Sequence, residues 1–131
     1  MEMEITFPEG RYMEGRYKDF VVRLGPSEEP WWEGERPAPF DMFIMSIGLC
    51  TGSMIWAFLD HRSLPVGEVK IILRRETDEK IHMITEITTV LNMPADFPEK
   101  YRNAIARVAD ACAVKKHMVQ APKFTTEVNI G

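Results

Sequence analysis

Residues 39–62 read PFDMFIMSIGLCTGSMIWAFLDHR, and the rest of the chain has to be arranged around this stretch. No charged residue occurs from Met42 to Leu59, and apolar side chains would occupy every side of a helix formed here. A helix that is apolar all round has to be buried, either in a membrane or at the centre of a fold. Small residues around Cys50 and acids at both ends favour a soluble fold over a membrane span of about 18–20 residues. We therefore expect a central helix, capped by Asp41 or by a residue before it.

Composition and charge place the chain among ordinary globular proteins. The 131 residues are 45% apolar and 27% charged, which is enough to build a core in a single domain spanning residues 1–131. The net charge of −4 and the absence of long basic runs argue against nucleic acid as a partner, because few cations could neutralise phosphates. The first residues, MEMEITFPEG, are acidic where a signal peptide would be basic. We expect a cytoplasmic protein that neither enters a membrane nor uses its two cysteines as a structural disulfide.

The residues before the central helix alternate between short strands and turns. Alternating apolar residues predict strands at 3–7, 11–13 and 17–24. Glycine, proline and acidic residues predict turns between them, at 8–10 and at 14–15. The pattern is typical of a β-meander.

The residues after the central helix predict a long hairpin. Alternation around valine, isoleucine and threonine predicts strands at 66–76 and 80–91, and Thr77-Asp78-Glu79 would join them as a turn. The short meander and this one hairpin offer little cover for a helix that is apolar on every face. We therefore expect an obligate dimer in which a second copy supplies the missing cover.

A second helix follows the hairpin. An acid, a proline and Glu99 mark its start, and its apolar face would include Cys112. Residues 115–120 either continue this helix or begin another, and residues 123–130 predict a final strand.

The sequence lacks the motifs of most kinds of active site. The three histidines are scattered and there is no CxxC pair, so we expect no metal site. There is also no Gly-rich phosphate loop and no GxSxG elbow, and we expect no cofactor. Cys50 and Cys112 remain, each on the apolar face of a predicted helix. A cysteine in that setting is most often a small core residue. Whether these two are inert or reactive has to be judged from the residues that flank them.

Two segments carry a family resemblance. PAPFDMFIMSIGLCTG at 37–52 and ADACAVKKHM at 109–118 resemble the superfamily of osmotically inducible protein C (OsmC) and organic hydroperoxide resistance protein (Ohr). The closest similarity is to its YhfA-like branch, in which a proline, an acid and an apolar run lead to a Gly-rich approach to cysteine. The resemblance implies an α+β fold built as an intertwined homodimer. Two central cysteine-bearing helices would pack against antiparallel sheets.

The resemblance also implies an activity in defence against oxidative stress. Cys50 would attack an organic hydroperoxide as a thiolate, Cys112 would resolve the resulting sulfenic acid, and a small dithiol would reduce the disulfide. An apolar pocket would favour organic hydroperoxides over hydrogen peroxide. Two other interpretations stay open: a non-catalytic dimer that binds a small hydrophobic ligand, and a soluble domain with two inert core cysteines.

A buried thiolate needs a stabilising cation, because burial in apolar surroundings raises the pKa of a thiol. By resemblance this cation is an arginine, and Arg36, in the loop before the central helix, is our first choice. Asp41 could orient Arg36 by a charge-assisted hydrogen bond, since Phe40 stands where the peroxidases have a glutamate. Asp41 itself would lie about 13.5 Å along the helix from Cys50, too far to touch it within one chain. The alternatives to Arg36 are the arginines of the meander: Arg11, Arg16 and Arg23.

Overall fold

The computed structural model describes residues 1–10, 12–24 and 39–131. Arg36 and Arg11 therefore lie outside the described residues. Two units make up the described chain, residues 1–45 and residues 46–131, and the central helix contributes residues to both.

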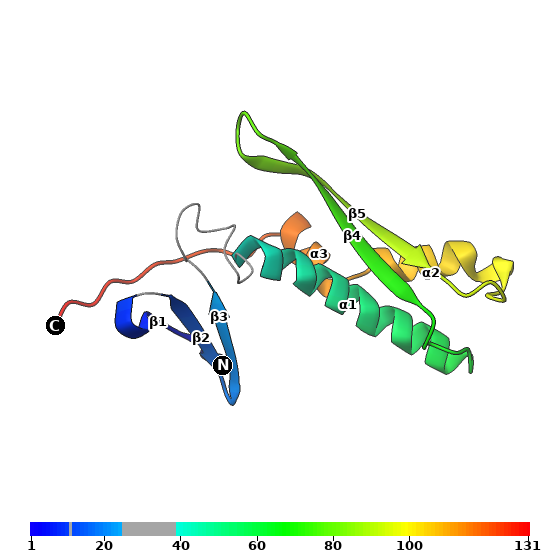
Figure 1. Ribbon diagram of the computed structural model, residues 1–131, viewed down its shortest axis with the longest axis horizontal. Helices are drawn as coiled ribbons and strands as arrows, with labels where there is room; N and C mark the ends of the chain where they lie inside the picture. The colour runs from blue at the N-terminus through cyan, green and yellow to red at the C-terminus, as the bar shows by residue number, and fades with distance from the viewer. Residues whose placement is uncertain (11, 25–38) are drawn as a thin grey trace. The chain divides into compact units, whose positions relative to one another are not determined.

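The first unit carries the predicted meander as a three-stranded antiparallel sheet in the order β1-β2-β3 (Figure 1). A short 3₁₀ helix, η1, takes the place of the first predicted turn. The bounds are β1 Glu4–Thr6, η1 Pro8–Gly10, β2 Met13–Tyr17 and β3 Phe20–Leu24. The second predicted turn was wrong, because Glu14 and Gly15 lie inside β2. The chain reverses after Tyr17, which pairs with Phe20, and Lys18 adopts the positive φ of 52° that this tight turn requires.

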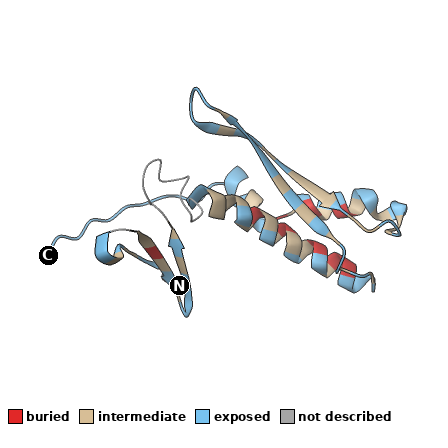
Figure 2. Ribbon diagram, in the orientation of Figure 1, coloured by how far each residue is buried: buried red, intermediate tan, exposed pale blue. Residues whose placement is uncertain are grey.

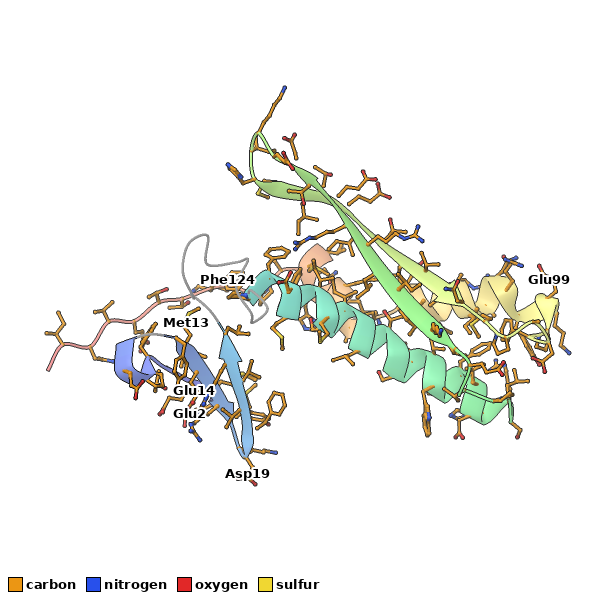
Figure 3. The ribbon with its side chains drawn as sticks, viewed as in Figure 1. Glu2, Met13, Glu14, Asp19, Glu99 and Phe124 are labelled. Carbon is orange, nitrogen blue, oxygen red and sulfur yellow. The ribbon has the colours of Figure 1, made fainter. Side chains whose placement is uncertain are left out.

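One face of this sheet holds a buried carboxylate between two guanidinium groups. Glu14 projects from the three-stranded sheet (Figure 3). Its exposed fraction is only 4%. It accepts hydrogen bonds of 2.7 Å from Arg16 Nε and 2.8 Å from Arg23 Nε. The bond from Arg23 lowers the pKa of Glu14 most, and Arg16 adds to the shift against the opposing effect of burial. Two of the arginines predicted as partners of Cys50 are thus bound to Glu14 on their own sheet.

The predicted central helix is confirmed as α1, Pro39–His61. It begins at Pro39, a residue suited to the first helical position, so Asp41 lies in the first turn and is not the N-cap. Burial follows a single stripe along the helix (Figure 2). The stripe consists of Ile47, Thr51, Ile55, Phe58 and Leu59.

One chain leaves part of α1 uncovered. Leu49 is 69% exposed and Trp56 is 55% exposed. By length and composition α1 could also cross a membrane, with a mean hydropathy of 1.8 and 28% of that window buried. The core helix of a soluble protein passes the same test, so length and hydropathy do not decide between the two environments.

The predicted hairpin is present as β4, Lys70–Asp78, and β5, Met83–Asn92, which pair antiparallel. Both strands begin and end later in the chain than predicted, and the turn falls at residues 79–82, after a bulge at Glu76/Thr77. Glycines let β4 approach α1 closely. A Cβ built on Gly48 would lie 2.7 Å from Leu73 Cδ1, so the side chain of Leu73 occupies the space that a larger residue would need.

The second helix is broken into three pieces. They are η3 Glu99–Tyr101, α2 Arg102–Asp110 and α3 Ala113–Val119. Two residues of α2, Ile105 and Ala109, close the main core against Ile55, Phe58 and Leu59 of α1.

The predicted final strand was wrong. Residues 121–131 are exposed and have no regular structure. A strand exists only where its backbone hydrogen-bonds to a neighbour, and no strand among the described residues pairs with this segment.

The core gives a first prediction. Leu59 is fully buried between the two main helices, so Leu59→Ala should lower the free energy of unfolding by about 2–5 kcal/mol through lost burial and the cavity left behind. Ile81→Ala, at a residue that is 62% exposed, should change it by less than about 0.5 kcal/mol. Urea denaturation measures both, and similar losses for the two variants would contradict this account of the core.

Candidate active site

Cys50 lies near the middle of α1, beside the buried stripe, and it is half-buried. The residue after it, Thr51, belongs to the stripe and is fully buried. Ser53 donates a hydrogen bond of 2.7 Å from Oγ to the Cys50 carbonyl oxygen. The helix thus places the Cys50 sulfur at the border between core and surface.

Cys112 is not on a helix, contrary to the sequence prediction. It is the residue between α2 and α3, with φ −56° and ψ 129°, and this extended conformation ends one helix and starts the next. Its side chain is fully buried. The thiol donates a long hydrogen bond to the Ile47 carbonyl oxygen, with Sγ 4.0 Å from the oxygen. The break at Cys112 is the local feature from which the rest of the site follows.

The break supplies hydrogen-bond donors to Cys50. The first hydrogen bond of α3 runs from Lys116 N to Cys112 O, so the amides of Ala113 and Val114 precede that bond and have no partner within the helix. Both amides act as hydrogen-bond donors that lower the pKa of the Cys50 thiol. The unpaired N–H groups in the first turn of a helix stabilise a negative charge placed near them.

These contacts lower the pKa of the Cys50 thiol. The largest cause is the hydrogen bond from the Val114 amide, and the Cys112 side chain contributes the next. Burial opposes the shift, while the Ala113 amide and the positive charge of Lys115 add to it. Lys115 is held near α2 by an ion pair with Asp110, at 3.6 Å between Nζ and Oδ1.

The structure brings together two of the predicted site residues, Cys50 and Cys112. Asp41 lies in the first turn of α1, and Arg36 lies outside the described residues. Among the described residues, the charged side chain that lowers the pKa of Cys50 is Lys115. Sequence reasoning missed Lys115 and the two amides. The one signal was the Lys115-Lys116 pair that follows Cys112 so closely.

The two cysteines of the site are free thiols. In the described parts of the chain, no three histidine, cysteine or acidic side chains lie close enough to hold a metal ion. The groups that the structure gathers at Cys50 are the Cys112 thiol, two backbone amides and one lysine.

The family model for OsmC-like proteins matches residues 32–127. The chain belongs to the OsmC-like protein family. The predicted superfamily is thereby confirmed, and the YhfA-like branch stays a prediction. No curated protein matches this OsmC-like chain.

Solved structures share the fold of this OsmC-like protein. A Psychrobacter arcticus 273-4 protein named for osmotic stress induction and detoxification response superposes with a TM-score of 0.74 at 12% identity, covering 88% of this chain and 86% of that one. An OsmC-like protein from Mycoplasma pneumoniae gives 0.71 at 10% identity, covering 92% and 86%. A hypothetical protein from Aquifex aeolicus VF5 gives 0.69 at 18% identity, covering 92% and 87%. The predicted α+β class with antiparallel sheets is confirmed.

The amide contacts give a second prediction. Ala113→Pro removes one donor to Cys50, and proline suits this first position of α3 because Cys112 already has the extended conformation that precedes proline. Losing a donor to the thiolate should raise the pKa of Cys50, so alkylation by iodoacetamide should reach half its maximal rate at a higher pH than in the wild type. Ala113→Ser keeps the amide hydrogen and is the matched control. An unchanged pH profile in Ala113→Pro would show that the amide does not stabilise the thiolate.

Proposed function

We propose that this protein is a thiol peroxidase that reduces organic hydroperoxides, with Cys50 as the attacking thiolate and Cys112 as the resolving thiol. The observation that carries the proposal is the pairing of Cys112 with a Cys50 whose pKa is lowered by backbone amides and a lysine. A core cysteine without such contacts would have a raised pKa. The name of the Psychrobacter relative, which refers to detoxification, agrees with a role in stress defence.

The reaction balances with the residues present and two reactants. The Cys50 thiolate attacks one peroxide oxygen, the O–O bond breaks, and an alcohol leaves after taking up a proton, which gives a sulfenic acid on Cys50. The Cys112 thiol then attacks that sulfur, and water leaves as the disulfide forms. A small dithiol would return both cysteines to thiols and become a disulfide itself. The two amides that face the Cys50 sulfur would stabilise the thiolate before attack.

Our proposal includes a homodimer in the cytoplasm. Leu49 and Trp56 are seven residues apart on α1, so they share one face, and both are more than half exposed. Exposed apolar faces of this kind mark interaction surfaces. The uncovered carboxyl-terminal segment, with Phe124, Val128 and Ile130 exposed, is a further apolar element that a second copy could cover.

A second candidate function is the binding of a small hydrophobic ligand without catalysis. A cavity of about 550 Å³ lies between β5 and α2, with Leu91, Met93, Phe97 and Ile105 among its apolar lining residues. Its size is in the range of small-molecule sites. Ligand binding there would not require Cys50, so Cys50→Ser should abolish peroxide reduction and leave binding of an apolar fluorescent probe unchanged.

The peroxidase proposal gives a third prediction. Treatment of the reduced protein with one equivalent of cumene hydroperoxide should produce a disulfide between Cys50 and Cys112, detected by peptide mass spectrometry under non-reducing conditions. In Cys112→Ser the same treatment should leave a sulfenic acid on Cys50 that dimedone traps, because the resolving thiol is missing. Cys50→Ser serves as the control and should consume no hydroperoxide. Recovery of both thiols unmodified in the wild type would rule out the proposed activity.

The dimer gives a fourth prediction. Light scattering of the wild type should give twice the chain mass of 15.1 kDa. Leu49→Asp should shift the population towards monomer. In the dimer this apolar face would be buried, and the new carboxylate would lose its water without gaining a partner. Leu49→Met keeps an apolar side chain and should remain dimeric. A stable wild-type species of 15.1 kDa that unfolds cooperatively would refute the dimer.

A further inference from the structure

Thr51 carries a hydroxyl group with no hydrogen-bond partner inside the protein. The residue is fully buried in the stripe of α1, and its Oγ1 is the buried side-chain oxygen without a partner among the described residues. Leaving a buried hydroxyl unpaired costs about 1–3 kcal/mol. Native proteins keep few such groups, and each one calls for an explanation.

The ordinary acceptor for this hydroxyl is already engaged. In a helix, a threonine hydroxyl donates to the carbonyl three or four residues earlier, and for Thr51 the fourth is Ile47. The Ile47 carbonyl has two lone pairs, one of which takes the backbone N–H of Thr51 in the regular helix. The Cys112 thiol donates to the same oxygen. Cys112 and the Thr51 hydroxyl therefore compete for one remaining lone pair.

The Cys112 thiol has one hydrogen, and it contacts the Ile47 carbonyl oxygen. When that hydrogen is lost as a disulfide forms, the carbonyl of Ile47 loses its second donor. The carbonyl is buried with its helix and cannot recruit water freely, so a nearby donor would be stabilising at that moment.

We propose that Thr51 is a positioning residue for the redox pair: its hydroxyl replaces the Cys112 thiol as the second donor to the Ile47 carbonyl when the Cys112 hydrogen is lost to a disulfide. The exchange stabilises the oxidised pair relative to the dithiol, in which the hydroxyl is left unpaired. The inference rests on the proposed formation of a disulfide between Cys50 and Cys112. It does not depend on which oxidant forms that bond.

The measurement is the equilibrium between this disulfide and dithiothreitol. Dithiothreitol gives two protons and two electrons to the protein disulfide and closes into its own cyclic disulfide, so the ratio of oxidised to reduced protein at known dithiothreitol ratios yields the equilibrium constant. Thr51→Val keeps the shape and removes the hydroxyl. It should move the equilibrium towards the dithiol by about fivefold, which corresponds to one hydrogen bond of ordinary net strength. Thr51→Ser keeps the hydroxyl and should stay within about twofold of the wild type.

Two further variants serve as a control and as a second test. Ser53→Ala removes a hydroxyl from the same helix that bonds to the Cys50 carbonyl, and it should leave the equilibrium constant unchanged. Thr51→Ala also lacks the hydroxyl and should shift the equilibrium in the same direction as Thr51→Val, which provides a second test if the valine variant folds poorly. In urea, the reduced form of Thr51→Val should be at least as stable as the reduced wild type, because an unpaired buried hydroxyl has been removed.

The outcomes separate this inference from the proposed function. Equal equilibrium constants for the wild type, Thr51→Val and Thr51→Ala would overturn the role of Thr51 and leave the peroxidase proposal standing. A threonine with only a structural role would change the stability of both redox forms alike and give this result. Failure of the wild type to form a Cys50–Cys112 disulfide at any dithiothreitol ratio would overturn both.

Discussion

The contact between the buried stripe of α1 and the inner face of α2 holds the larger unit of this protein together. Ile55 and Leu59 meet Ile105 and Ala109 there, and each large apolar side chain buried in this way contributes about 1.5–3 kcal/mol. The same contact determines the site. Once Ala109 is fixed against α1, Cys112 follows within a single turn of chain and is carried to the level of Ile47 and Cys50. The packing of α2 against α1 therefore also brings the two thiols together.

The electrostatics of the site come mainly from the backbone. The extended conformation of Cys112 interrupts what would otherwise be one helix, and the new start leaves two amides without partners inside α3. Those amides face Cys50, and the side chain of Lys115 has the smallest of the effects that lower the pKa of Cys50. A donor fixed in the backbone needs no side-chain ordering to reach its target, which would suit the thiolate of the proposed peroxidase. Under that proposal, the backbone donors would activate Cys50 in a chain that has Phe40 in the place of the family's glutamate.

One chain leaves exposed many apolar side chains that a stable soluble protein would bury. The exposed face of α1 and the uncovered carboxyl-terminal segment together present large apolar side chains to solvent, and a soluble monomer rarely keeps so many on its surface. The three-stranded sheet and the two-stranded hairpin also leave their outer strands unpaired among the described residues. A partner chain could satisfy both, by hydrogen-bonding to the unpaired strand edges and by burying the exposed apolar side chains.

The sequence by itself determined α1, the meander, the long hairpin and the identity of the two thiols. These features follow from local rules: a long uncharged apolar run predicts a helix, alternation predicts strands, and the residues around Cys50 and Cys112 carry the family pattern. The turn at Lys18 escaped prediction because a positive φ at lysine leaves no compositional mark. Only the tertiary structure decided that Cys112 lies in a break between helices, since the apolar spacing through residue 112 is the same for a continuous helix and a broken one. It also decided that residues 121–131 form no strand in this chain, because a strand depends on a neighbour that no local sequence encodes. The amides that activate Cys50 are invisible in sequence for the same reason: every residue has one, and only the path of the backbone selects which two face the sulfur.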